Sequence, residues 1–215
     1  MEESMKNNIM KTGTTTIGIV YKEGILLAAD RRATAGNMIA NKKAIKVVEI
    51  TEKIAVTMAG TVSDAQLLIN LAQAELRLKK IRTGRELMVK EAAHLFARMV
   101  YSNIRRMSLI PGVSHFLLGG TDSTGQHLYD IFPDGSITDV EDFVSSGSGS
   151  VFAYGVLENG YKNNMTEPEA LDLAMRGLNA ALQRDSASGN GIDVLVITKE
   201  GMKKLVDKDV TPKVI

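Results

Sequence analysis

The stretch Gly13-Thr14-Thr15-Thr16-Ile17-Gly18, near the amino terminus, carries the strongest single indication of fold and chemistry. A threonine hydroxyl is a weak nucleophile at neutral pH and normally needs a neighbouring base. A threonine at a chain terminus brings its own base, because a free α-amino group has a pKa near ~8 and can accept the hydroxyl proton through one water. Cleavage between Gly13 and Thr14 would create such a terminus. The alternative is an ordinary β-strand, since β-branched residues favour strands.

Composition restricts the class of protein. A chain of 215 residues, 44% of them hydrophobic, is long enough for one domain with a substantial core. Its formal net charge of +1 gives no basic surface for nucleic acid. The absence of cysteine excludes disulfides, thiolate nucleophiles and cysteine-bound metals.

The sequence shows no apolar run of the length that a membrane span needs. Residues 1–13 contain Glu2, Glu3, Lys6 and Lys11 and lack the apolar centre of a signal peptide. We therefore expect a cytoplasmic protein that does not contact membranes, with residues 1–13 as a propeptide or a disordered tail.

Hydrophobic periodicity predicts strands and helices in separate groups. The predicted strands are 14–22, 25–29, 44–50, 53–58, 113–118, 126–132, 137–143 and 192–199. The predicted helices are 63–82, opened by a Ser63–Gln66 capping box, 85–107, 151–158, and 167–183 with Thr166 as its cap. This segregation indicates an α+β domain with two facing sheets and helices outside.

Familiar cofactor and metal motifs are missing. Gly13 and Gly18 have the glycine spacing of a phosphate-binding loop, but Ile19 and Val20 stand where Lys and Ser or Thr are required. The three histidines, at 94, 115 and 127, show no metal-ligand spacing. We expect no metal and no cofactor.

Two charged residues fall in apolar surroundings. Asp30 ends the predicted strand 25–29, and Lys46 lies inside the apolar run 44–48. A buried lysine is costly unless it is paired, so a Lys46–Asp30 pair across neighbouring strands would satisfy both and place a cation beside Thr14. That cation would favour the deprotonated hydroxyl. The alternative is surface charge on edge strands.

From Thr14 onward, the chain resembles the β subunits of the 20S proteasome, most nearly the archaeal ones. Five ordered blocks carry the resemblance: residues 13–18; Ala28-Ala29-Asp30-Arg31-Arg32-Ala33-Thr34; Met58-Ala59-Gly60-Thr61-Val62-Ser63-Asp64-Ala65-Gln66; Gly147-Ser148-Gly149-Ser150 with Tyr154-Gly155-Val156-Leu157; and Arg184-Asp185-Ser186-Ala187-Ser188-Gly189.

The resemblance implies an N-terminal-nucleophile hydrolase, a four-layer αββα sandwich spanning residues 14–215. It implies that Thr14 is the nucleophile of a threonine-type endopeptidase after autocatalytic removal of residues 1–13 at the Gly13–Thr14 bond. The other implied site residues are Asp30 and Lys46 beside the nucleophile, Arg32 in support of Asp30, the Gly60 amide as oxyanion donor, and Ser148, Asp185 and Ser188 around the terminal amine and catalytic water.

Substrate binding is implied at two sets of positions. An extended peptide would bind by its backbone between Thr34 and Gly60. The pocket for the residue before the scissile bond would be lined by small or apolar residues, which favours large hydrophobic side chains and a chymotrypsin-like activity. Those residues are Ala33, Ala44, Met58 and Val62.

Assembly is implied as well. The family forms paired seven-membered β rings between α-subunit rings, fed with unfolded polypeptides by an unfoldase ATPase, and helices 63–82 and 85–107 are candidates for ring contacts. Three alternatives stay open: a bacterial-type ATP-dependent protease subunit, another N-terminal-nucleophile amidohydrolase, and an inactive structural ring subunit.

Overall fold

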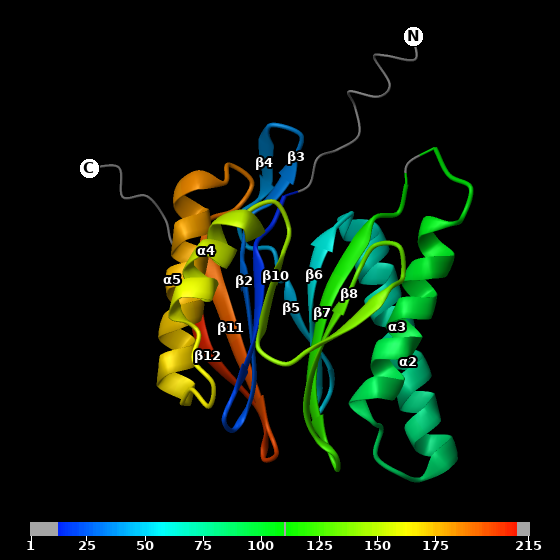
Figure 1. The fold of residues 1–215 in the computed structure, drawn as a ribbon. Coiled ribbons are helices and arrows are strands. Elements are labelled where there is room, and N and C mark those ends of the chain that lie inside the picture. The colour runs from blue at the N-terminus through cyan, green and yellow to red at the C-terminus, as the bar shows by residue number, and fades with distance from the viewer. Residues whose placement is uncertain (1–12, 110, 210–215) are drawn as a thin grey trace.

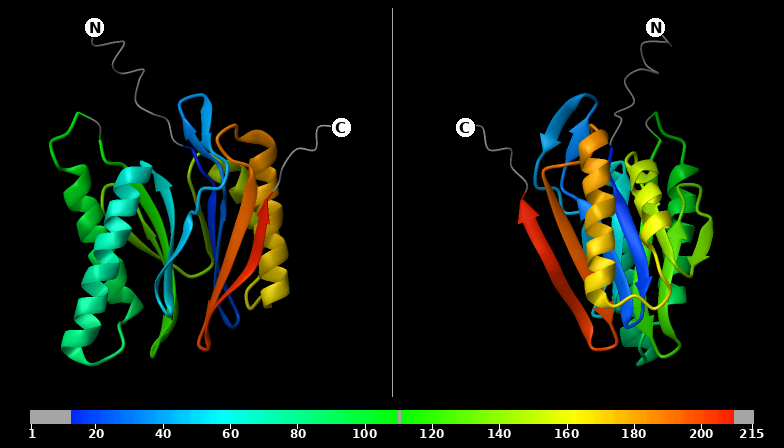
Figure 2. Two further views of the ribbon diagram at one scale, coloured as in Figure 1. Left: turned by 180° about the vertical axis from the view of Figure 1, so that it is seen from behind. Right: turned by 60° about the vertical axis from the view of Figure 1, so that its left-hand side comes forward.

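Two five-stranded antiparallel sheets lie face to face, and each is covered on its outer side by a pair of helices (Figure 1). This computed structural model describes residues 13–109 and 111–209. The first sheet has the order β10-β1-β2-β11-β12 and the second β5-β6-β7-β8-β9. The views in Figure 2 show the same layering from two further directions. The predicted four-layer αββα sandwich is confirmed.

The strands of the first sheet are β1 (Thr16–Tyr21), β2 (Gly24–Asp30), β10 (Phe143–Ser146), β11 (Gly191–Thr198) and β12 (Gly201–Asp209). Those of the second are β5 (Val47–Thr51), β6 (Ile54–Gly60), β7 (Ser114–Asp122), β8 (Gly125–Ile131) and β9 (Ile137–Val140). The helices are α2 (Val62–Thr83), α3 (Val89–Ile104), α4 (Ser150–Gly160) and α5 (Glu167–Arg184). A separate hairpin of β3 (Ala33–Ala35) and β4 (Met38–Asn41) projects beyond the first sheet in Figure 1.

Three hydrophobic clusters hold the four layers together. One joins α2 and α3 to the second sheet and includes Phe96 and Phe116 in edge-to-face contact, with ring centroids 5.2 Å apart. A second joins α4 and α5 to the first sheet, around Ile17 and Leu173. The third lies between the sheets and includes Leu27 and Leu117. Burial on both faces explains why β2 reads as a continuous apolar run.

The helix predictions hold except at the amino-terminal ends of α2 and α3 and at the carboxyl end of α3, which is Ile104 rather than Met107. The N-cap of α2 is Thr61 rather than Ser63, so the predicted Ser63–Gln66 capping box is wrong. The helix α3 begins at Val89, four residues later than predicted, after a segment held by Glu91. Thr166 caps α5 as expected, and its backbone N–H donates to Glu169 over 2.8 Å.

The strand predictions fail where strands are polar or divided. The stretch 33–41, which lies between the predicted strands 25–29 and 44–50, forms the β3–β4 hairpin. The predicted strand 137–143 is two strands, because β9 pairs with β8 in the second sheet and β10 pairs with β1 in the first. The strand β12 was missed because its solvent-facing residues include three lysines. β5 begins at Val47, after Lys46 rather than around it.

The structure describes only one side of the predicted boundary at Gly13–Thr14 beyond these two residues. Both residues are described, whereas residues 1–12 lie outside the described part, so a propeptide at 1–13 and a domain at 14–215 remain predictions. Within residues 13–109 and 111–209, no helix is both long enough and apolar enough to cross a membrane.

The carboxylate of Glu91 holds the start of α3, so the stability of the fold should depend on the protonation of Glu91. Its oxygens accept hydrogen bonds from Arg85 (2.6 Å), Lys79 (2.9 Å) and the Met88 backbone N–H (3.1 Å). The hydrogen bonds from Arg85 lead the interactions that lower the Glu91 pKa to about 2. A lowered carboxylate pKa stabilises the fold above the unfolded value of roughly 4.3.

We expect Glu91→Gln to lower the free energy of unfolding at pH 7 by about 1 kcal/mol. The difference from wild type should disappear as the pH falls from roughly 4.3 toward about 2, because protonation removes the same contacts from the wild type. Denaturant unfolding of the isolated chain across this range measures it. Glu75→Gln, an exposed change on α2, is the control. A difference that persists at the acid end would contradict this account.

Candidate active site

Asp30 and Lys46 form a buried ion pair between the two sheets. Asp30 ends β2 with none of its surface exposed, and its Oδ1 lies 2.7 Å from Lys46 Nζ, which is 4% exposed as a residue. The predicted pair is therefore confirmed, and surface charge is wrong for Lys46. Its geometry differs from the prediction, however: the pair joins opposite sheets, because Lys46 precedes β5 of the second sheet.

The Asp30 carboxylate is also saturated by backbone donors. Oδ1 accepts the N–H of Thr15 over 3.0 Å, and Oδ2 accepts the N–H groups of Arg32 and Gly189, each over 2.9 Å. These donors come from three separate segments of the chain. Asp30 thus fixes the residue after Thr14, the entry to β3 and the loop before β11 around one carboxylate.

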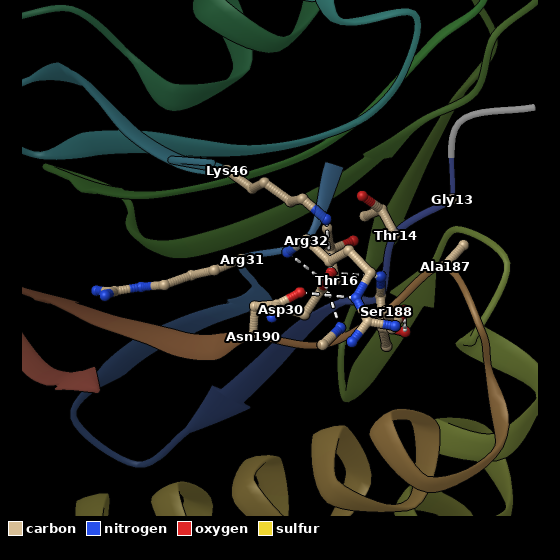
Figure 3. Close-up of polar contacts among 12 residues, drawn as sticks. Gly13, Thr14, Thr16, Asp30, Arg31, Arg32, Lys46, Ala187, Ser188 and Asn190 are labelled. Atoms are coloured by element: carbon tan, nitrogen blue, oxygen red, sulfur yellow. Dashed lines mark hydrogen bonds and ion pairs between the residues drawn. The ribbon is translucent and has the colours of Figure 1, made fainter. Parts of the chain in front are cut away.

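Burial lowers the pKa of Lys46, and the charge and hydrogen bond of Asp30 oppose that shift only in part. An ammonium with a lowered pKa gives up and recovers its proton more readily near neutral pH. Figure 3 shows the Lys46 side chain reaching into the region between Thr14 and Asp30. The lysine can therefore stabilise negative charge that develops at this end of the site.

Thr14 is 5% exposed and is enclosed by the glycine-rich loop 147–149. Its backbone N–H donates to Ser148 Oγ over 3.2 Å, and its carbonyl accepts the Gly149 N–H over 3.3 Å. Gly147 has φ +91°, and a Cβ there would collide with the Thr14 carbonyl. Glycine is needed because the loop passes so close to the Thr14 backbone.

A second carboxylate, Asp185 at the carboxyl end of α5, organises the opposite side of Thr14. Its Oδ2 accepts the hydroxyls of Ser148 over 2.7 Å and Ser188 over 2.6 Å. Ser188 is buried and also lies 2.7 Å from Thr15 Oγ. The structure thus brings the three predicted residues Ser148, Asp185 and Ser188 into one hydrogen-bonded group that reaches the Thr14 nitrogen.

Arg32 holds the loop that carries Ser188. Its Nε donates to Asn190 Oδ1 over 2.8 Å, and its Nη1 donates to the Ser186 carbonyl over 2.7 Å. Asn190 adopts a positive φ of 65°, which asparagine tolerates better than most residues. Sequence reasoning missed Asn190, although an Asn between two glycines is a recognisable turn signal. It also missed the amides of Thr15 and Gly189, which leave no side-chain signature.

The residues predicted for peptide binding lie around the same end of the sheets. Thr34 of β3 accepts the Gly13 N–H over 3.3 Å, and Gly60 ends β6 with φ +104°. Ala33 and Ala44 are half-buried, while Val62 opens α2 at 38% exposure. Met58 is buried within the cluster beneath α2 and α3. The roles of these residues in binding remain predictions.

Two of the histidines bond to residues outside this site. His115 pairs with Asp130, and His127 contacts Thr124 and lies 3.6 Å from Asp122. Among residues 13–109 and 111–209, no three His, Cys, Asp or Glu side chains are grouped closely enough to hold a metal ion. The chemistry that the described side chains support is proton transfer and charge stabilisation around the Thr14 hydroxyl and nitrogen.

The chain is similar to known proteins over most of its length. Residues 10–197 match the family described as Proteasome: Proteasome subunit. The chain is 48% identical over 202 residues to the proteasome subunit beta of Methanocorpusculum labreanum, covering 94% of this chain and 93% of that protein. It is 46% identical to that of Methanosphaerula palustris, covering 91% of each, and 43% identical to that of Ferroglobus placidus, covering 92% of each.

The ion pair yields a prediction about stability. We expect Lys46→Met to cost about 3–5 kcal/mol of unfolding free energy, because it leaves the Asp30 carboxylate buried without a cation. The double variant Lys46→Met/Asp30→Asn should lose less than the sum of the two single changes, since neither partner is then left as an unpaired charge. Denaturant unfolding of the four proteins completes the cycle.

Lys204→Met is the matched control, because Lys204 also bonds a buried aspartate, Asp193, over 3.0 Å but is itself 48% exposed. Asp193 keeps Arg31 as a partner in that variant. The control should cost less than about 1 kcal/mol. Additive losses in the Lys46 and Asp30 cycle would contradict the coupling.

Proposed function

The chain belongs to the proteasome subunit family, and from that premise we propose that it is a proteolytically active β subunit of the 20S particle with Thr14 as its nucleophile. Membership makes it a protease subunit that assembles into proteasome particles. The contacts around Thr14 support the proposal that the subunit is catalytic. The Thr14 N–H donates to Ser148, and the adjacent Thr15 N–H donates to Asp30, which forms the buried ion pair with Lys46.

Activation begins with the chain's own Gly13–Thr14 bond. The Thr14 hydroxyl attacks the Gly13 carbonyl carbon, its proton passes to the departing Thr14 nitrogen, and an ester replaces the amide. Water then hydrolyses the ester, which releases residues 1–13 and a free Thr14 amine. The Gly13 and Thr14 N–H groups, bonded to Thr34 and Ser148, hold both sides of this bond.

Peptide hydrolysis uses the freed amine as the general base. Ser148, itself bonded to Asp185, orients that amine, and Ser188 fixes Asp185 from the other side. The Lys46 ammonium stabilises the deprotonated Thr14 oxygen. The Gly60 backbone N–H donates a hydrogen bond to the oxyanion, and the loss of such a donor elsewhere costs about 3–4 kcal/mol.

Substrates are unfolded polypeptides, bound by their backbone between β3 and the end of β6 and cleaved after large hydrophobic residues. That preference is supported by the small or apolar side chains of the four residues proposed to line the pocket, Ala33, Ala44, Met58 and Val62. Homo-heptameric β rings between α-subunit rings, an unfoldase ATPase and a cytoplasmic location complete the proposal. Confinement in a barrel suits an endopeptidase of broad specificity.

The test is co-expression with the α subunit of the same genome, followed by intact-mass analysis and peptidase assays. We expect wild-type chains to begin at Thr14. Thr14→Ala should keep residues 1–13 and lose at least ~10³-fold in activity, because no hydroxyl remains to attack. Thr14→Ser, which retains a hydroxyl, is the control and should be processed.

Two outcomes would favour other functions. Assembled wild-type particles that keep residues 1–13 and lack peptidase activity would support an inactive structural subunit. A processed chain that fails to assemble with α rings but hydrolyses small amides would support an amidohydrolase.

A further inference from the structure

Asn103, near the carboxyl end of α3, links three segments of the chain that meet beside Gly60. Its Nδ2 donates to Asp64 Oδ1 in the first turn of α2 and to the Gly112 carbonyl just before β7, each over 3.0 Å. Asn103 is half-buried and Gly112 is buried. Figure 1 shows the end of β6 and the start of β7 at the same, upper end of the second sheet. The two bonds therefore tie α3 to both segments that adjoin Gly60.

The chain fits closely at Gly112. A Cβ there would collide with Asn103 Nδ2 and with Asp64 Oδ1. The Val113 N–H donates to the Pro111 carbonyl over 3.0 Å, which tightens the turn that leads into β7. Polar contacts thus hold this turn against α2 and α3, and the turn cannot shift without breaking them.

The same turn fixes the backbone of Gly60. A Cβ on Gly60 would collide with the Val113 carbonyl oxygen, and the Thr61 N–H donates to that oxygen over 2.8 Å. Gly60 has φ +104°, a conformation that glycine adopts readily and other residues do not. The position of Val113 therefore sets the position of the Gly60 peptide.

The direction of the Gly60 N–H follows from the pairing of β6. Successive N–H groups along a strand point to opposite edges. Because the Thr61 N–H points to β7, the Gly60 N–H is directed toward the other edge of β6. The N–H of Met58, two residues earlier, points to that edge as well and donates to the Lys46 carbonyl over 2.9 Å. The Gly60 N–H thus lies on the Lys46 side of β6, where the proposed function requires an oxyanion donor.

We propose that Asn103 is a positioning residue for this oxyanion donor. Through Gly112 it holds the Val113 carbonyl against Gly60, and through Asp64 it holds the first turn of α2, which begins soon after Gly60. The inference rests on the proposed role of the Gly60 N–H. A hydrogen bond to an oxyanion is sensitive to small displacements of its donor. Loss of the two Asn103 bonds therefore slows the chemical step and leaves substrate binding unchanged.

The test uses particles assembled with the α subunit, with rates expressed per chain that begins at Thr14. Asn103→Leu removes both bonds at similar volume and should lower kcat for a fluorogenic peptide roughly 10-fold, with KM within about twofold of wild type. Affinity for a peptide boronate should fall by a similar factor. The Thr14 oxygen bonds to boron and its proton passes to the Thr14 amine, so the tetrahedral anion mimics the transition state.

Two further variants separate positioning from stability. Glu91→Gln is the matched control, because it weakens contacts at the opposite end of the same helix and should leave kcat unchanged. In the exchange variant Asn103→Asp/Asp64→Asn, the amide at 64 can donate to the carboxylate at 103, but that carboxylate cannot donate to the Gly112 carbonyl. We expect the exchange variant to unfold at higher denaturant than Asn103→Leu and to keep the reduced kcat.

Wild-type kcat and boronate affinity in Asn103→Leu, or a rise in KM alone, would overturn the inference. If Asn103→Leu does not assemble, the exchange variant decides the question, because wild-type kcat there would overturn it equally. Wild-type particles that are unprocessed or inactive would instead refute the proposed function, so the two failures are distinguishable.

Discussion

The buried Asp30–Lys46 ion pair is the constraint on which the rest of the site depends. Both side chains are buried, and an unpaired charge there would be strongly unfavourable. The Asp30 carboxylate accepts hydrogen bonds from one ammonium and three backbone N–H groups, which offset the cost of burying its charge. These four bonds fix the positions of the four donors relative to one another. One of them is Thr15, which is why the start of β1, and with it Thr14, cannot shift along the sheet without breaking the network.

The two carboxylates of the site have different surroundings, and this suits them to different tasks. Asp30 is fully buried and bonded to a lysine whose pKa burial lowers, so in the proposed mechanism the pair acts on charge at the hydroxyl side of Thr14. Asp185 is bonded to two serine hydroxyls, one buried and one exposed, and so reaches the nitrogen side through neutral groups. In the proposed mechanism, separating a cationic side from a hydroxyl-lined side would let one threonine serve as both nucleophile and, once freed, base.

The sequence predicted what hydrophobic pattern and charge burial can specify. The strand β2 and the helix α5 were predicted because a continuous apolar run and a capping residue are visible in the local sequence. The burial of Lys46 was predicted because its charge lies within an apolar run. β12 and the β3–β4 hairpin were missed because their exposed residues remove the apolar pattern. The Asp30 partners at Thr15 and Gly189 are backbone amides, and the division of 137–146 between two sheets depends on pairing across more than 100 residues.

The most direct test of the central claim is to locate a covalent adduct. A peptide carrying an electrophile that reacts with a hydroxyl and a neighbouring amine would be given to assembled particles, and the modified residue identified by tandem mass spectrometry. We expect modification of Thr14 through both its oxygen and its α-nitrogen, in chains that begin at Thr14, and loss of labelling when Lys46 is replaced in particles that still assemble. Labelling of another residue, or of Thr14 irrespective of Lys46, would contradict it.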